Sequence, residues 1–323
     1  MNSDIVRTQF FTTNYKKILN GLKIPQGKVY VDPFAGNCDL KEVCPTKSWL
    51  FYDIDPKKEN VIQNDSLLNP IDYTGKIVIT NPPWLAKNKT KQFQNVFEKY
   101  AVDDLYKCSI LSILGCDGGI LIIPTNFWMD ERSAKVRKLF LSKYRVEKVN
   151  VFDEQVFEDT PYTTCSFSFT KSDLELTEQT ITFNNITLTL KKDLNWRVGG
   201  EFYKKYETIK SFFTRLKLKD VPTQTNIFLY GVDTREQKLH LEYRSIPYYG
   251  KVSDRGFATL VSKKVITAET QQQIIAIFNR YINFVRYLYN DMILTIFRDH
   301  GRKRIPLDLA YAICTEIYNR LKE

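Results

Sequence analysis

The feature that most constrains this chain is the segment 77–84, which reads Ile-Val-Ile-Thr-Asn-Pro-Pro-Trp. Its apolar first half predicts a buried strand. Pro82 and Pro83 end that strand, because neither can donate a ladder hydrogen bond. Asn81 precedes a proline and is therefore restricted to an extended conformation. The segment thus places Asn81 at the carboxyl end of a strand, which is where open α/β sheets bind their ligands.

Asn81 and the three residues after it suit chemistry on the exocyclic amino group of a planar base. The lone pair of such a nitrogen is delocalised into the ring, which makes the nitrogen a poor nucleophile. The side-chain oxygen of Asn81 and the carbonyl of Pro82 offer two acceptors for its hydrogens. Trp84 offers a flat surface on which the base can stack. The alternative is a strand that ends in an ordinary Pro-Pro turn.

Length and composition predict a globular intracellular chain. With 323 residues, 43% hydrophobic and 26% charged, it can bury the cores of one large and one smaller domain. No apolar run reaches the ~20 residues of a membrane span, and the N-terminus has no signal-peptide pattern. The six cysteines are scattered without a Cys-x-x-Cys pair. This predicts reduced thiols, no metal site and a cytoplasmic location.

The positive charge is concentrated in the second part of the chain. Residues 1–195 hold 25 basic and 24 acidic side chains, whereas residues 196–323 hold 22 and 13, a net charge of +9. We therefore expect a nearly neutral catalytic part followed by a part that binds a polyanion. The alternative is that the basic residues only keep the surface soluble.

Periodicity predicts strands that alternate with helices. Strands are expected at 29–32, 49–53, 61–63, 77–79, 120–123, 146–152 and 165–169, with helices near 14, 39, 91–114 and 130–142. This alternation predicts a parallel, doubly wound α/β sheet. Further elements are expected as a hairpin at 179–198, short strands over 221–262, and helices at 201–217, 268–297 and 307–321.

Two of the predicted strands end in an acidic side chain. Asp32 is followed by a turn containing Gly36, which lets a small ligand approach the backbone closely. With Asp32 beside it, this turn suits a cationic or amino-bearing ligand better than a phosphate. Asp53 ends the next strand, in the place where an acidic residue commonly takes the two hydroxyls of a ribose. The turn is not G-x-G-x-x-G, so no dinucleotide site is predicted.

Four sets of residues, in this order and spacing, resemble those of S-adenosylmethionine-dependent amino-methyltransferases. They are Phe10-Phe11-Thr12-Thr13, Asp32-Pro33-Phe34-Ala35-Gly36, Asp53-Ile54-Asp55-Pro56 and Asn81-Pro82-Pro83-Trp84. More narrowly, residues 7–170 resemble a DNA N6-adenine methyltransferase whose cofactor motifs precede the catalytic motif. The resemblance implies a Rossmann-like, seven-stranded class I methyltransferase domain over 1–172. It also implies a basic target-recognition region of mixed α+β structure over 173–323.

The same resemblance implies which residues contact S-adenosylmethionine. Those near its methionine end would be Thr12, Thr13, Asp32, Phe34 and Gly36. Asp53 would take the ribose hydroxyls, and Ile54 would pack on the cofactor's adenine. Asp65 would accept a hydrogen bond from the amino group of that adenine; the alternative is that Asp65 is only a turn residue.

For the DNA, the resemblance implies that the catalytic motif, Asn81 to Trp84, holds the flipped target base. Phe157 is the candidate for a second ring against that base, with a core phenylalanine as the alternative. The densest basic cluster would hold the DNA backbone, and it comprises Arg298, Arg302, Lys303 and Arg304. One departure from the family pattern is Cys38, which stands where a second glycine is usual. A narrowed cofactor pocket and a reactive thiol beside the cofactor are its two expected consequences.

The implied function is transfer of a methyl group to adenine N6 of double-stranded DNA, in a restriction-modification or viral DNA-modification context. The implied partners are DNA and a cognate restriction endonuclease, and the implied oligomeric state is a monomer. N4-cytosine enzymes more often carry Ser before Pro-Pro, and protein-glutamine enzymes resemble chains with a helical domain before the sheet. An RNA N6-adenine methyltransferase and a catalytically silent nucleic-acid-binding module with this fold remain as alternatives.

Overall fold

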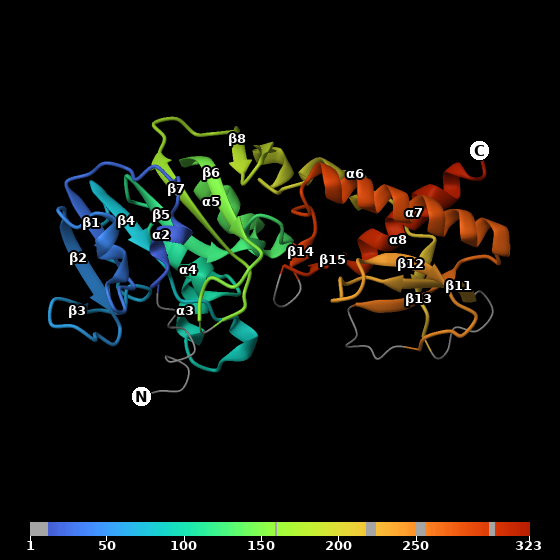
Figure 1. Cartoon of the computed structure of the whole chain (residues 1–323), viewed down its shortest axis with the longest axis horizontal. Helices are drawn as coiled ribbons and strands as arrows, with labels where there is room; N and C mark the ends of the chain where they lie inside the picture. Colours follow the sequence, from blue (N-terminus) through green and yellow to red (C-terminus); the bar gives the residue numbers. More distant parts are fainter. Residues whose placement is uncertain (1–11, 159, 218–223, 250–255, 297–300) are drawn as a thin grey trace. The chain divides into compact units, whose positions relative to one another are not determined.

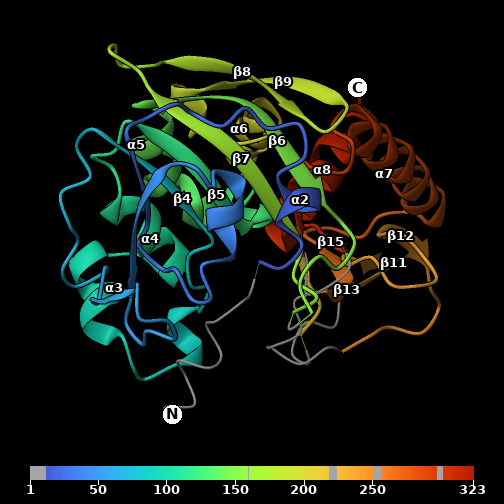
Figure 2. The same cartoon turned by 60° about the vertical axis from the view of Figure 1, so that its left-hand side comes forward.

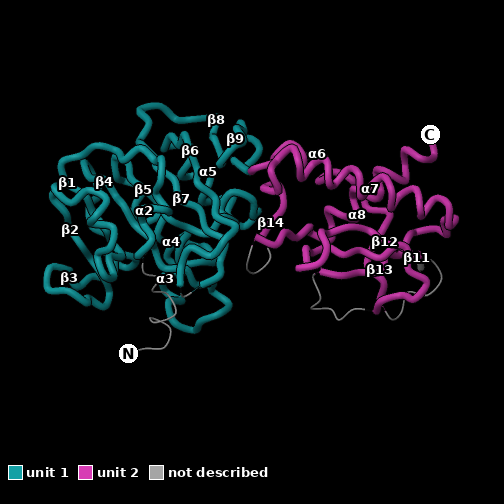
Figure 3. Tube along the Cα trace, viewed as in Figure 1, with its two compact units in different colours: residues 1–197 teal, residues 198–323 magenta. Residues whose placement is uncertain are grey.

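A computed structural model of the chain shows two compact units, residues 1–197 and 198–323 (Figure 3). It describes residues 12–158, 160–217, 224–249, 256–296 and 301–323. Each unit has a sheet and a buried core of its own. Among the helices of the described residues, none is long and apolar enough to cross a membrane.

The first unit is built on a nine-stranded sheet with the order β3-β2-β1-β4-β5-β7-β6-β8-β9 (Figures 1 and 2). The strands are β1 (Val29–Asp32), β2 (Ser48–Asp53), β3 (Ile62–Gln63), β4 (Lys76–Thr80), β5 (Gly118–Pro124), β6 (Tyr144–Phe152), β7 (Thr164–Lys171), β8 (Glu178–Phe183) and β9 (Ile186–Lys191). The pairs from β3 to β5 are parallel, and β7 runs antiparallel between β5 and β6. The order of the first seven strands confirms the predicted class I methyltransferase fold. The predicted parallel pairing holds from β3 to β5, whereas β7 and β9 run antiparallel to their neighbours.

Helices lie on both faces of this sheet, which makes it doubly wound as predicted. They are α2 (Tyr15–Ile18), η1 (Asp39–Val43), η2 (Lys87–Lys89), α3 (Gln94–Tyr100), α4 (Leu105–Ser112), η3 (Thr125–Phe127), η4 (Glu131–Ser133), α5 (Ala134–Leu141) and η5 (Lys192–Leu194). Ser166 of β7 donates to the carbonyl of Ile18 in α2 at 2.5 Å. The next residue, Phe167, packs edge to face on Phe140 of α5 with ring centroids 6.1 Å apart. Successive residues of a strand point to opposite faces, so α2 and α5 cover opposite sides.

The connections around the first strands are short. The link between β1 and β2 contains only η1, and the described residues 54–75 between β2 and β4 contain no helix, although one turn of helix was expected there. A turn takes its place, in which Asp65 Oδ1 accepts from the backbone N–H groups of Leu67 and Leu68, both at 3.0 Å. A side chain that caps a turn in this way replaces the first bonds of a helix.

The hairpin β8–β9 extends the sheet of the first unit. Gln179 of β8 joins the hairpin to the rest of the sheet. It is buried and donates to the carbonyls of Leu141 and Tyr144 at 2.7 and 2.9 Å. Gln179 also accepts from the N–H of Val146 at 2.8 Å. The division between the units therefore falls after Arg197, later than the boundary expected after residue 172.

The second unit contains a four-stranded antiparallel sheet with the order β10-β13-β11-β12. Its elements are α6 (Gly200–Glu207), β10 (Phe213–Arg215), β11 (Gln224–Tyr230), β12 (His240–Tyr243), β13 (Phe257–Ser262), α7 (Ala268–Leu288), the short pair β14 (Thr295–Ile296) and β15 (Lys303–Arg304), and α8 (Leu307–Arg320). Ile227 and Leu241 of the sheet share one core with Ile274 and Phe278 of α7.

Two helices of this unit end earlier than predicted. The helix expected over 201–217 stops at Glu207, because Phe213 is buried where β10 pairs with β13. The helix expected over 268–297 stops at Leu288, because Asn290 and Asp291 adopt left-handed backbone angles with φ of 46° and 61°. Asn and Asp tolerate this conformation better than most residues, and a helix cannot continue through it.

Candidate active site

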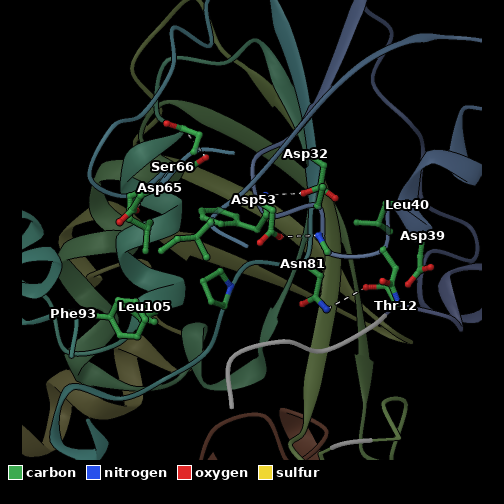
Figure 4. A pocket seen from close by; sticks show the side chains of 18 residues that line it. Thr12, Asp32, Asp39, Leu40, Asp53, Asp65, Ser66, Asn81, Phe93 and Leu105 are labelled. Atoms are coloured by element: carbon green, nitrogen blue, oxygen red, sulfur yellow. Dashed lines mark hydrogen bonds between the residues drawn. The ribbon is translucent and has the colours of Figure 1, made fainter. Parts of the chain in front are cut away.

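A pocket of about 850 Å³ lies at the carboxyl ends of β1, β2 and β4 (Figure 4). It is lined by Thr12, Asp32, Phe34, Ala35, Gly36, Asn37, Asp39, Leu40, Asp53, Ile54, Asn64, Asp65, Ser66, Leu67, Asn81, Pro83, Phe93 and Leu105. All the predicted cofactor residues except Thr13 are in this set; Thr13 is exposed.

Asp32 joins the end of β1 to the end of β4. Its Oδ1 accepts from the hydroxyl of Thr80 at 2.7 Å and from the N–H of Phe34 at 3.1 Å. Burial raises the pKa of the Asp32 carboxyl to about 7, and these hydrogen bonds act in the opposite direction. Thr80 immediately precedes Asn81. The hydrogen bond from Thr80 to Asp32 therefore fixes the start of the catalytic motif.

Asp53 at the end of β2 holds the turn that follows β1. Its Oδ2 accepts from the N–H of Gly36 at 2.8 Å, and its Oδ1 accepts from the N–H of Asp55 at 2.9 Å. Gly36 has a φ of 46°, which a residue without a side chain adopts at little cost. Asp53 therefore shapes the pocket wall besides lining the pocket itself.

The composition of the lining fits S-adenosylmethionine. The carboxylates of Asp32, Asp53 and Asp65 lie at separate points of the pocket and can accept from amino and hydroxyl groups. Phe34 and Ile54 add apolar surface for a planar ring. The set contains no basic side chain, which agrees with a cationic rather than a phosphorylated ligand.

Asn81 lies at the mouth of the same pocket and is oriented by Thr12. The Asn81 side chain donates from Nδ2 to the hydroxyl oxygen of Thr12 at 3.1 Å (Figure 4). The bond turns the amide so that its oxygen points away from Thr12. Thr12 itself is buried. The sequence assigned Thr12 to the cofactor and gave no sign of this contact with the catalytic motif.

The far end of the catalytic motif is held by Asp104, the residue before α4. Its Oδ1 accepts from the N–H of Leu85 at 3.1 Å, and the Leu85 carbonyl accepts from the N–H of Leu105 at 3.1 Å. Burial raises the pKa of Asp104 to about 6. The motif is thus fixed through Thr80 on one side and Leu85 on the other, which limits the movement of Asn81 between them.

Trp84 and Phe157 touch each other. Their ring centroids lie 5.4 Å apart at an interplanar angle of 84°, an edge-to-face contact. Trp84 is 6% exposed and Phe157 is 3% exposed. In this conformation no base fits between the two rings. The structure brings the two predicted stacking residues together, and their role in binding a base stays a prediction.

Cys38 does not narrow the pocket. It has a φ of 60° and packs in an apolar cluster with Ala35, Phe51 and Val61 instead of lining the pocket. Burial raises the pKa of its thiol, which disfavours the reactive thiolate. The expected narrowing of the pocket is therefore wrong, because the backbone turns the Cys38 side chain into the core, and the reactivity of the thiol stays a prediction.

The basic cluster expected to hold DNA differs from the expectation in one residue. Lys303 is 3% exposed, so its ammonium group is poorly placed to meet a phosphate. Arg302 and Arg304 are half-buried, and Arg298 lies outside the described residues. Lys303 and Arg304 are neighbours in β15, and neighbouring residues of a strand point to opposite sides. This explains why the Lys303 side chain is buried while Arg304 is partly exposed.

Several pocket residues were not predicted. Most of them flank predicted ones and follow from the same turns: Ala35, Asn37, Asp39, Leu40, Asn64, Ser66 and Leu67. Phe93 and Leu105 come from the segments before α3 and at the start of α4, and no motif in the sequence marks them. Their contribution depends on how these helices pack against the sheet.

A family comparison covers the central part of this site. Residues 53–157 match the Eco57I restriction-modification methylase family. This segment contains Asp53, Asp65, Asn81, Trp84 and Phe157 and is about a third of the chain. The match confirms the resemblance to restriction-modification methyltransferases that the motifs implied. No curated protein sequence matches the chain.

Solved structures of related architecture were also found. The type I restriction enzyme EcoKI M protein has 14% identity and a TM-score of 0.43, covering 97% of this chain and 73% of that one. A type I restriction-modification methyltransferase subunit from Streptococcus thermophilus has 14% identity, a TM-score of 0.37 and coverages of 63% and 55%. The type IIG restriction endonuclease BpuSI has 12% identity, a TM-score of 0.41 and coverages of 67% and 36%. The chain spans about half the length of several such proteins.

Proposed function

We propose that the protein methylates adenine N6 in DNA, with S-adenosylmethionine as the methyl donor. One observation carries the proposal. Asn81 and Pro83 of the catalytic motif line the same pocket as the carboxylates Asp32 and Asp53. A motif suited to an amino group and a lining suited to a cationic cofactor therefore meet in one place. The family match over residues 53–157 supports a role in DNA modification.

In this proposal each residue has a defined task. Asp32 and Asp53 hold the cofactor through its amino and hydroxyl groups, and S-adenosylmethionine supplies an activated methyl group. Asn81 Oδ1 and the Pro82 carbonyl accept from the two hydrogens of the target amino group and localise its lone pair on nitrogen. Fixed acceptors stabilise the positive charge that develops on that nitrogen. The excess proton leaves to solvent afterwards.

The target base has to leave the duplex, because its amino group is otherwise paired. Trp84 provides the stacking surface, and Phe157 packs against that ring in an edge-to-face contact. We therefore propose that Phe157 shifts when a base enters.

The experiment is transfer of label from S-adenosylmethionine to duplex DNA, with RNA in parallel, by wild-type protein and Asn81→Ala. Loss of one positioned acceptor lowers such rates by roughly 10²- to 10³-fold. We expect N6-methyladenine in DNA and its loss in the variant. Calorimetry of cofactor binding by Asn81→Ala is the control, and it should match wild type within a few-fold.

Other outcomes decide between the alternatives. Label in RNA alone would keep the chemistry and replace the substrate. Methylation at cytosine N4 would overturn the choice of base. Cofactor binding without transfer to any nucleic acid would favour the silent module, and absence of cofactor binding would remove the proposal altogether.

A further inference from the structure

The four-stranded sheet of the second unit has two unlike faces. One face carries Ile227, Leu229, Leu241 and Leu260, which share a core with α7 and α8. The other face, which we call the aromatic face, holds Phe228, Tyr230, His240, Glu242 and Phe257. The register shows this directly: Tyr230 pairs with both His240 and Phe257, and Phe228 pairs with Glu242. Directly paired residues lie on the same face.

The rings of the aromatic face support one another. Tyr230 stacks on His240 with centroids 4.7 Å apart, and Phe228 meets Tyr230 edge to face at 4.9 Å. Phe228 lies parallel to Phe257 at 6.4 Å. Such contacts fix the orientation of each ring. A row of oriented rings therefore lies on the side of the sheet opposite its packed core.

Arg244 and Tyr248 extend this row toward solvent. The Arg244 guanidinium lies over the Phe228 ring at 4.1 Å from its centroid and donates to Glu242 at 3.0 Å and to the Tyr230 hydroxyl. Tyr248 meets Phe228 edge to face at 5.7 Å. The side chain of Arg244 is 36% exposed and Tyr248 is 37% exposed. Each thus keeps accessible surface while its position is fixed from below.

We propose that the aromatic face binds unpaired nucleotides by stacking their bases, with Arg244 and Tyr248 as the contact residues. One known class of RNA-binding module stacks bases on aromatic residues of a four-stranded sheet, and proteins that bind single strands commonly use aromatic side chains in this way. Arginine adds a planar cation that stacks on bases as well as on rings. The net charge of +9 over residues 196–323 attracts the phosphates.

This inference rests on the proposed function in one respect, namely that the substrate is a nucleic acid. It adds that the second unit recognises unstacked bases, such as those that base extrusion creates, and not only the edges of paired ones. Stacking tolerates many sequences. The aromatic face would therefore contribute affinity for opened DNA, and sequence readout would come from other side chains.

The test is fluorescence anisotropy of the full chain with single-stranded and duplex oligonucleotides. We expect Arg244→Ala and Tyr248→Ala to weaken single-strand binding about 5- to 150-fold, the effect of losing one base–side-chain stack. Tyr248→Phe keeps the ring and should bind like wild type. Tyr287→Ala is the matched control, because Tyr287 is 83% exposed on α7 and lies outside the aromatic face.

Arg244→Lys separates stacking from charge. The lysine keeps the charge without the planar group, so we expect it to bind nearly as weakly as Arg244→Ala. Wild-type affinity of Arg244→Lys, or equal affinities of Tyr248→Ala and Tyr287→Ala, would overturn the proposal, and so would binding to duplex alone. If the oligonucleotides bind normally to both alanine variants, a protein becomes the better occupant of this face.

Failure of the proposed function would look different. Asn81→Ala should lose methyl transfer, whereas Arg244→Ala and Tyr248→Ala should still weaken single-strand binding in the Asn81→Ala background. If wild type binds strands through Arg244 and Tyr248 but transfers no methyl group, only the proposed function fails. If wild type binds no nucleic acid at all, both proposals fail together.

Discussion

The two units each bury an aspartate beside a strand, and they use it in opposite ways. Asp233 in the second unit accepts from both terminal nitrogens of Arg286 at 2.8 Å and from the N–H of Leu239 at 2.8 Å. Burial would raise the pKa of Asp233, but the bonds from Arg286 hold it below its usual range. Among the described residues of the first unit no cation is paired with Asp32, and burial raises its pKa to about 7. A buried carboxylate with its own cation stabilises a fold, whereas one without remains available to a cationic ligand.

The largest effect expected from this comparison follows Asp233→Ala. The change leaves the Arg286 guanidinium buried with Asp291 as its remaining ion partner among the described residues, and removal of one side of such a pair costs about 3–5 kcal/mol. Chemical denaturation should show that loss in the free energy of unfolding of the second unit. Cofactor binding should persist, since the pocket belongs to the first unit. Loss of both together would show that the units do not fold independently.

The second effect concerns pH and Asp32. Because its pKa in the folded protein lies above the ordinary value, the folded state binds this proton more tightly than the unfolded chain. Its contribution to stability is therefore present at low pH and is lost as pH rises through about 4 to 7, by up to about 4 kcal/mol. The difference in unfolding free energy between wild type and Asp32→Asn should show that slope. If this difference in unfolding free energy does not change with pH, the pKa of Asp32 in the folded protein is not raised.

The same carboxyl makes cofactor binding depend on pH. A cationic ligand prefers the ionised form, so the association constant for S-adenosylmethionine should fall about tenfold per pH unit below about 7. In Asp32→Asn the affinity should be weak and nearly independent of pH over that range. Calorimetry between pH 5.5 and 8, a range that extends roughly one unit or more on either side of the Asp32 pKa, measures the affinity of wild type and of Asp32→Asn.

A smaller effect is expected from Thr12→Val. The variant keeps the shape of the side chain but removes the acceptor for Asn81 Nδ2. Loss of one neutral hydrogen bond costs about 0.5–1.5 kcal/mol, so kcat should fall about 2- to 10-fold while the KM for DNA changes little. Thr12→Ser restores the hydroxyl and should recover most of the rate. An unchanged kcat in Thr12→Val would show that Asn81 is oriented by other groups.

The smallest effect is expected from Cys38→Gly. Glycine relieves a left-handed conformation that costs about 1–2 kcal/mol, but it also removes a buried sulfur from the cluster with Phe51. The two terms nearly cancel, so the unfolding free energy should change by less than about 1 kcal/mol and cofactor affinity should not change. A gain in cofactor affinity would show that the thiol does reach the pocket.

Local patterns predicted much of the first unit. The strands that carry Asp32, Asp53 and Asn81 were located from apolar runs, because a run of β-branched residues closed by proline or a glycine turn has few other structures available. The described residues of the four motifs also lie within or beside the pocket, and Phe10 and Phe11 of the first motif lie outside the described residues. The second unit was harder, because α6 and α7 end where sheet pairing and left-handed residues override helical periodicity.

The sequence by itself determined which chemical groups this protein has and the order in which strands present them. It determined that Asn81 stands at a strand end, because Pro82 and Pro83 allow no continuation. The tertiary structure alone decided which groups meet: Thr12 with Asn81, Trp84 with Phe157, and Cys38 with the core. These contacts join residues distant in sequence or depend on which way a backbone turn directs a side chain. No periodicity encodes them, and packing of the whole sheet and its helices is what brings them together.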